Sequence, residues 1–268
     1  MKSYLSQTLF LAGFTRRSQT YAQAMVAADL QPEFSLIYGT QTVGSSPRLD
    51  RCTEPLEHRP TRGVGPTDAI VSQGLWLPDL REPLLRTLHK NHWSHKIYPT
   101  ENVNSDRIKA VILELKPRLI IFSGYGGEIV REGLLGLGIP ILHIHPGKLP
   151  EFRGSTTLYY SWLLHGKCYA TALLLNAGID TGDIVGEKEY PPPPDGMDPD
   201  FIYDPAIRAN LLITVLQNYQ KNGSFQKKKQ PREGTTYFVI HPVLKHLARL
   251  QEVEADFRGS IRRYSLQR

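Results

Sequence analysis

Residues 119–123 read Leu-Ile-Ile-Phe-Ser, and residues 139–144 read Ile-Pro-Ile-Leu-His-Ile. Both are short, mainly apolar runs, which is the pattern of strands buried on both faces of a sheet. Between them, residues 129–137 predict a short helix. A strand, a helix and a second strand in this order are typical of a parallel sheet with helical connections. We therefore predict an α/β fold.

The same alternation continues toward both ends of the chain. It predicts further strands over residues 8–12, 34–38, 96–98 and 169–175. It predicts further helices over residues 18–30, 79–90, 105–116, 155–165 and 206–220. We expect Ser18 to cap the first of these helices and Ser105 or Asp106 to cap the third.

Two segments interrupt this pattern. Residues 40–77 are rich in Pro, Gly, Ser, Thr and Arg and predict a long loop. Residues 191–194 are four consecutive prolines, which favour a stiff extended segment. We therefore expect a core unit over residues 1–190, followed over residues 191–268 by a Pro-rich arm, a helix and a basic C-terminal extension.

The composition is that of an ordinary globular protein. Apolar residues make up 40% of the 268 residues and charged residues 22%, which excludes collagen-like, acidic disordered and coiled-coil chains. No apolar run reaches about 18 residues, so we expect no membrane partner. Cys52 and Cys168 are too few for a disulfide framework or a cysteine zinc cluster. Polar residues interrupt the apolar stretch at residues 4–14, which favours a first strand over a secretory signal. We therefore expect a cytoplasmic protein.

The net charge of +6 is concentrated at the C-terminal end. Residues 221–268 hold eleven Lys or Arg against four Asp or Glu, whereas residues 1–220 hold twenty-one against twenty-two. A charged run of this kind is most often a solvated face. The alternative is a patch that attracts an anionic substrate or a nucleic acid.

Two histidines and an acid stand where an α/β sheet places its ligands. Residues 141–154 read Ile-Leu-His-Ile-His-Pro-Gly-Lys-Leu-Pro-Glu-Phe-Arg-Gly, so His143 and His145 end a buried strand. Being two residues apart, they should point to the same side of it. Residues 177–183 then place Asp180 in a glycine-flanked turn after the next strand. A histidine with a carboxylate favours general acid–base chemistry. A His-x-His-plus-Asp metal site is the alternative, but spacing alone does not set ligand geometry, so we expect no metal.

Residues 143–154 resemble the Asn-x-His-x-Ser-x-Leu-Pro-x-x-Arg-Gly signature of the N10-formyltetrahydrofolate-dependent formyltransferases. That family includes enzymes acting on methionyl-tRNA, on glycinamide ribonucleotide and on amino sugars. Residues 178–183 look like its Gly-Leu-Asp-Thr-Gly-Asp segment, and residues 119–129 look like the strand and loop that line its folate cleft. The likeness covers residues 8–190. It implies a Rossmann-like core with a mostly parallel sheet, and N10-formyltetrahydrofolate as co-substrate.

The resemblance implies roles for the three candidate catalytic residues. His145 would be the catalytic histidine and Asp180 its partner acid, with Asp183 the less favoured carboxylate. His143 stands where the family has an Asn that stabilises the developing oxyanion. A neutral imidazole donates from one nitrogen and a protonated one from both, so His143 could still serve as a pH-sensitive donor. Shifted chemistry and a decayed, noncatalytic site are the alternatives.

The resemblance also implies two sets of binding residues. The donor site would be edged by Gly124, Tyr125, Gly126, Glu128, Ile129, Gly178 and Asp183. The amine substrate would be bound by Gly147, Lys148 and Arg153. Two alternatives remain open: residues 124–128 could form a simple strand-to-helix turn, and Arg153 could bind local carbonyl groups instead of a substrate phosphate.

The segment after the core narrows the choice of acceptor. The 78 residues after Tyr190 show few strand signals, whereas methionyl-tRNA formyltransferases add a β-barrel domain. We therefore expect a small-molecule primary amine rather than tRNA, with a nucleotide-linked amino sugar as one candidate. A formyltetrahydrofolate hydrolase and a noncatalytic folate or nucleotide binder are the alternative functions. Residues 237–240 or 191–194 could mediate a homodimer.

Overall fold

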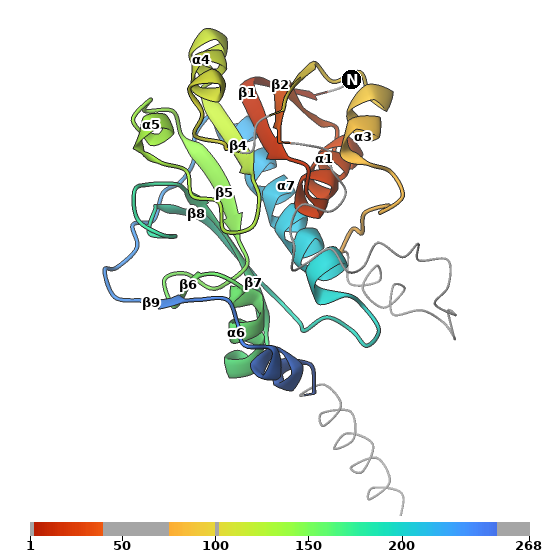
Figure 1. Cartoon of the computed structure of the whole chain (residues 1–268), viewed down its shortest axis with the longest axis vertical. Coiled ribbons are helices and arrows are strands. Elements are labelled where there is room, and N and C mark those ends of the chain that lie inside the picture. The colour runs from red at the N-terminus through yellow and green to blue at the C-terminus, as the bar shows by residue number, and fades with distance from the viewer. Residues whose placement is uncertain (1–2, 40–74, 100–101, 251–268) are drawn as a thin grey trace, which may run out of the picture.

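The fold is described by a computed structural model for residues 3–39, 75–99 and 102–250. Its centre is a seven-stranded sheet in the order β3-β2-β1-β4-β5-β7-β8, and β6 and β9 form a separate pair (Figure 1). The strands are β1 (Ser3–Gly13), β2 (Leu30–Tyr38), β3 (His95–Tyr98), β4 (Leu119–Ser123), β5 (Ile141–His145), β6 (Phe152–Gly154), β7 (Cys168–Leu174), β8 (Ile184–Tyr190) and β9 (Thr235–Tyr237). The predicted α/β fold is confirmed.

The sheet changes direction at one edge. The pairs among β1, β2, β3, β4 and β5 are all parallel, whereas β7 runs antiparallel to β5 and β8 antiparallel to β7. The sequence analysis did not predict β8. This strand is buried at its two ends and exposed over residues 187–189, so it lacks the apolar signal of an inner strand.

Helices cover both faces of the sheet. They are α1 (Arg16–Ala27), α3 (Leu84–Lys90), α4 (Asp106–Leu115), α5 (Glu132–Leu135), α6 (Thr157–His165), the π-helix η2 (Pro199–Tyr203) and α7 (Asp204–Asn222). Figure 1 shows α1 and α7 on one side of the sheet and α4 and α5 on the other. Two separate apolar clusters correspond to these two layers. The sheet is therefore buried on both sides between two layers of helices.

Five of the six predicted helix starts differ from the observed ones: α5 begins at Glu132 rather than 129, α6 at Thr157 rather than 155 and α7 at Asp204 rather than 206, and the differences at α1 and α3 have a local cause. The cap of α1 is Thr15, whose Oγ1 accepts a hydrogen bond from Ser18 N at 3.1 Å. The Ser18 hydroxyl instead donates to the Ser123 carbonyl at 2.8 Å, which ties α1 to the end of β4. Helix α3 begins at Leu84 rather than at 79, because Pro83 has no N–H to donate to the Asp79 carbonyl, which accepts from Gln23 of α1 instead. The prediction of Ser105 as the cap of α4 is confirmed.

The helix predicted beyond residue 190 is part of the main core. Ile207 and Leu211 of α7 belong to the same buried cluster as Tyr21 and Met25 of α1. The division of the chain at residue 190 stays a prediction. Most of the predicted loop at residues 40–77, and Cys52 within it, lie outside the described residues. Across the described ranges, no helix combines the length and apolar character needed to span a membrane.

Candidate active site

The predicted site lies at the carboxyl edge of the sheet. From β1 the chain moves outward to β2 and β3, and it returns to place β4 on the other side of β1. Loops diverge at such a switch point, which is where open α/β sheets bind ligands. The candidate residues follow β4 and β5 and occupy the turn between β7 and β8.

His145, the last residue of β5, is held through both ring nitrogens. Its Nδ1 lies 3.3 Å from Asp180 Oδ2. Its Nε2 lies 2.6 Å from the Phe152 carbonyl oxygen and 3.0 Å from Thr157 Oγ1. The side chain is buried, and burial lowers its pKa while the Asp180 carboxylate opposes that shift. The structure therefore brings the two predicted partners together, with the His145 ring buried and Asp180 partly exposed.

Asp180 sits in a constrained turn. Its φ of 51° lies in the left-handed region, which Asp tolerates better than most residues. Besides contacting His145, its Oδ2 accepts a hydrogen bond from Gly154 N at 2.8 Å. Gly182 follows, where an added Cβ would collide with the backbone of Leu174. The turn therefore requires glycine, and it fixes Asp180 against the loop after β5.

His143 lies on β5 in phase with Ile141, which packs in the cluster beneath α4. Its ring is 6.0 Å from the ring of Phe122, centroid to centroid. Its Nδ1 is buried, with no hydrogen-bond partner among the described residues. Burial holds its pKa well below the ordinary value, and the positive charges of Arg17 and Arg208 lower the pKa further. His143 is therefore neutral near pH 7, which removes the predicted charged form as a donor there.

Two arginines that sequence reasoning missed border the site. Arg17 of α1 donates to the Gly124 carbonyl and approaches Ser123 Oγ at 3.4 Å. Arg208 of α7 pairs with Asp204 at 2.9 Å and donates to the Ile144 carbonyl at 3.2 Å. Burial, together with the charge of Arg208, lowers the pKa of Arg17. The ends of β4 and β5 therefore carry two cations beside one carboxylate.

The predicted donor-site residues after β4 divide into two groups. Tyr125 and Glu128 face inward: the Tyr125 hydroxyl accepts from Phe14 N at 3.2 Å, and the Glu128 carboxylate accepts from Tyr125 N and Val103 N at 3.0 and 3.1 Å. The Tyr38 hydroxyl also donates to Glu128. These contacts tie together the carboxyl ends of β1, β2 and β4, which is what the strand-to-helix turn alternative predicts.

The other group of donor-site residues is open. Gly126 and Ile129 are exposed, and an added Cβ at Gly126 would meet nothing within 4 Å. Gly124 is enclosed, because an added Cβ there would collide with Phe122, Glu128 and Tyr38. A ligand could therefore approach the backbone at Gly126 but not at Gly124.

The predicted substrate residues lie in the loop after β5. Gly147 is buried. A Cβ added there would lie 2.9 Å from the Thr157 side chain and 3.0 Å from His145 Nε2, so the glycine leaves room for the His145 ring. Lys148 is partly exposed and lies 3.8 Å from Glu151. Arg153 is buried and turns toward residues 230–232, where it donates to the carbonyls of Pro231 and Arg232. Arg153 thus binds carbonyl groups, as the alternative predicted, but they belong to a segment 78 and 79 residues away and are not local.

The remaining predicted residues stand in the Asp180 turn. Gly178 donates its N–H to Asn176 Oδ1 at 3.1 Å. Asp183 uses its backbone carbonyl to accept from Leu174 N at 3.0 Å. Among the described contacts of His145, the carboxylate is that of Asp180 and not that of Asp183. In the described ranges, no group of three or more His, Cys, Asp or Glu is arranged to hold a metal ion.

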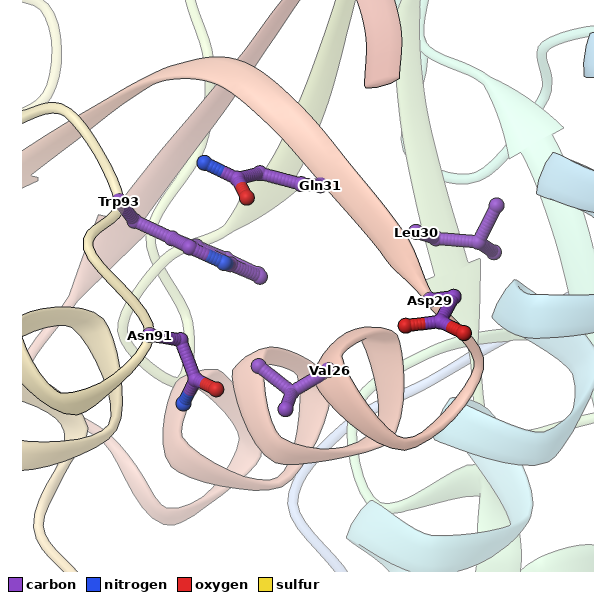
Figure 2. Close-up of a pocket in the computed structure, with 6 residues that line it drawn as sticks. All are labelled: Val26, Asp29, Leu30, Gln31, Asn91 and Trp93. Carbon is purple, nitrogen blue, oxygen red and sulfur yellow. The ribbon is translucent and has the colours of Figure 1, made fainter. Parts of the chain in front are cut away.

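A small cavity elsewhere in the molecule is separate from this site. Figure 2 shows it between the end of α1 and the start of β2, at the amino edge of the sheet. It is lined by Val26, Asp29, Leu30, Gln31, Asn91 and Trp93. The described contacts of His145, at the opposite edge, include none of these residues.

The residues that the sequence analysis missed are Arg17, Thr157, Arg208 and Gln230. Arg208 has a usable signal, because it stands four residues after Asp204 on a helix with an apolar face. Thr157 also has one, because it follows the histidine motif directly. Gln230 contacts the Asp180 turn across 50 residues, and nothing local marks it.

The chain is similar to known formyl transferases. Residues 78–197 match the family model described as formyl transferase. A methionyl-tRNA formyltransferase of Finegoldia magna is 27% identical over 149 residues, which cover 53% of this chain and 46% of that protein. A methionyl-tRNA formyltransferase of Campylobacter curvus is 33% identical over 93 residues, which cover 34% of this chain and 30% of that protein. The chain thus spans less than half the length of these relatives.

Solved structures share the fold. A sugar N-formyltransferase from a Shewanella species superposes with a TM-score of 0.52 at 16% identity, covering 90% of this chain and 85% of that one. A phosphoribosylglycinamide formyltransferase from Bacillus halodurans gives a TM-score of 0.51 at 13% identity, covering 81% and 96%. At these identities the likeness establishes the Rossmann-like fold.

Proposed function

We propose that this chain, whose residues 78–197 match the formyl transferase family model, is an N-formyltransferase that moves a formyl group from N10-formyltetrahydrofolate to a primary amine of a small molecule. The observation that carries the proposal is the contact of 3.3 Å between His145 and Asp180 at the carboxyl edge of the sheet. Both residues lie inside the matched region.

The reaction requires one proton to move. The amine nitrogen bonds to the formyl carbon, the bond from that carbon to N10 of the folate breaks, and a proton passes from the amine to N10. Formyl-folate supplies the electrophilic formyl carbon. The chain must therefore orient the amine, accept and return its proton, and stabilise a transient negative oxygen.

The geometry supports Asp180 as the member of the pair that meets the amine. His145 is enclosed, and each of its nitrogens already faces a protein group. Asp180 is the more exposed partner, and its described contacts use Oδ2. In this proposal the carboxylate accepts the proton while His145 holds it in place. The acid is thus the proton acceptor, whereas the resemblance implied a histidine base with an orienting acid.

His143 supports the oxyanion in the same scheme. A neutral imidazole can donate one N–H to the oxyanion, just as an Asn amide would donate one of its N–H groups to that oxygen. The unpartnered Nδ1 of His143 also fits a site that a bound ligand completes. The open backbone at Gly126 fits the approach of the folate on the neighbouring loop.

The charge of the site supports an acceptor that carries an anionic group. Arg17 and Arg208 approach the ends of β4 and β5, and Asp204 neutralises only one of them. A phosphate suits a guanidinium of this kind. A nucleotide-linked amino sugar combines such a phosphate with a primary amine. Beyond residue 197, the described residues contribute one strand, β9, which pairs with β6.

The test is release of free tetrahydrofolate from N10-formyltetrahydrofolate, with and without a panel of amines that includes nucleotide-linked amino sugars. We expect release that depends on the amine and is lost in Asp180→Asn and in His145→Ala. Asp195→Asn, which changes an exposed acid, is the matched control and should retain activity. Release without any amine would instead identify a hydrolase. Folate binding with no release under any condition would overturn the proposal in favour of a binding protein.

A further inference from the structure

A segment far along the chain borders both loops of the candidate site. Lys228 exchanges two backbone hydrogen bonds with Ile184, at 2.8 and 2.9 Å. Strand β9 pairs in parallel with β6, which follows the loop after β5. Figure 1 shows the two strands side by side. Ile240 N then donates to Thr156 Oγ1 at 2.8 Å. Residues 228–240, which the sequence analysis assigned to a basic extension, are therefore built into the site.

One side chain in this segment joins the two loops. The Gln230 amide nitrogen donates to the carbonyl of Asp180 at 2.9 Å and to that of Gly182 at 2.7 Å. Its amide oxygen accepts from Arg153 at 3.2 Å. Gln230 thus uses its donor group on the turn that carries the acid and its acceptor group on the loop after β5.

The contact supports the turn at an unfavourable point of its backbone. Asp180 has a positive φ, a conformation that costs free energy for any residue other than glycine and persists only where surrounding contacts impose it. Arg153, buried beneath, donates to the carbonyls of Pro231 and Arg232 and so fixes the segment that presents Gln230. The carboxylate of Asp180 consequently faces His145 from a backbone that Gln230 holds.

We propose that Gln230 is a positioning residue for formyl transfer, which sets the distance between Asp180 and His145 by bonding the Asp180 and Gly182 carbonyls. This rests on the proposed function. Gln230 contacts no reacting atom in this scheme and acts through Asp180. A small displacement of the acid is sufficient to lower the rate, because proton transfer requires hydrogen-bond distance.

The charges around His145 give a second consequence. Asp180 faces it from the β7–β8 turn, Arg208 and Asp204 from α7, and His143 from β5. Of these groups, Asp180 most strongly favours the protonated ring. If Gln230 holds Asp180 in place, removing its amide should move the titration of His145 to lower pH.

The experiment compares Gln230→Met with wild type in the full chain. Methionine keeps the length of the side chain and removes its hydrogen bonds. We expect kcat to fall about tenfold to a hundredfold, as for other residues that orient a catalytic group, with KM for both substrates near the wild-type value. The His145 ring, identified by the NMR signal lost in His145→Ala, should titrate at lower pH without any substrate present. Gln226→Met, at an exposed position two residues before this segment, should match wild type in both measurements.

Gln230→Asn covers the case in which the Met variant does not fold, because it keeps the amide on a side chain one methylene shorter. It should shift kcat and the His145 titration in the same direction and by less. A folded variant with wild-type kcat and wild-type His145 titration would overturn the inference. If wild type itself transfers no formyl group, the proposed function fails, and the substrate-free titration still decides whether Gln230 positions Asp180.

Discussion

His145 Nε2 lies 2.6 Å from the carbonyl oxygen of Phe152, seven residues further along the chain. The loop after β5 therefore folds back and places a backbone acceptor against its own histidine. With Asp180 on the other nitrogen, the ring has a single orientation that packing and hydrogen bonds define together. Such a ring suits a role in holding a carboxylate and its charge.

The hydroxyl of Thr157 is part of this support, since it contacts His145 Nε2 and the Pro146 carbonyl, each at 3.0 Å. We expect Thr157→Val to lower the free energy of unfolding by about 1–3 kcal/mol, because it leaves buried polar atoms without a partner. Urea titration measures this. Thr214→Val, at an exposed position of α7, should change stability by less than about 0.5 kcal/mol. Equal effects in the two variants would argue against the contact.

His143→Asn restores the residue that the family signature has at this position. Because the pKa of His143 lies well below its ordinary value, its ring is neutral from about pH 6.5 upward. We therefore expect the variant to keep the wild-type pH–rate profile between pH 6.5 and 9. His143→Leu, which offers no donor, should lose about 10²–10³ in kcat. A limb of the wild-type profile that vanishes in His143→Asn would show that the ring titrates in this range.

The same ring, which is partly buried and has an enclosed Nδ1, makes stability depend on pH. The folded protein keeps His143 neutral, whereas the unfolded chain protonates it below about pH 6.5, so the unfolded state binds more protons there. Stability is then fully present above about pH 6.5 and is lost as the pH falls below it. We expect the free energy of unfolding to decline between pH 6.5 and 5. The decline should be smaller in His143→Phe, and parallel curves for the two proteins would contradict the assignment.

Gly182 and Gly126 form a matched pair for the two loops. In Gly182→Ala the new methyl collides with the Leu174 backbone, so we expect a loss of about 1–3 kcal/mol of stability. In Gly126→Ala the methyl meets open space, so stability should change by less than about 0.5 kcal/mol. If formyl-folate approaches this backbone, Gly126→Ala should raise its KM while leaving the melting temperature unchanged. An unchanged KM would remove Gly126 from the donor site.

Substitution of Arg17 tests whether the amine substrate carries an anionic group. Removing a charge-assisted contact to a phosphate should raise the KM for a phosphate-bearing amine about tenfold to a hundredfold in Arg17→Met. An uncharged amine should be affected much less. Arg16→Met, at the adjacent exposed position, is the control and should leave both constants near wild type. If both amines respond alike to Arg17→Met, the arginine supports the loop rather than the substrate.

The sequence predicted most of the elements and the pairing of His145 with Asp180. The apolar runs at residues 119–123 and 141–145 predicted inner strands because burial on both faces leaves a local, readable pattern. His145 and Asp180 were found in motifs whose residues are close in sequence. The start of α1 was misplaced, because both Thr15 and Ser18 can cap a helix and only the contact with β4 separates them.

Only the tertiary structure decided the rest. It set β7 and β8 antiparallel, placed Arg17 and Arg208 at the ends of β4 and β5, and turned Arg153 away toward residues 230–232. It also brought Gln230 to the Asp180 turn. Each of these arrangements joins residues that are distant in the chain. The periodicity of a strand or helix reports which of its faces is buried, but it does not report which distant side chain will meet that face.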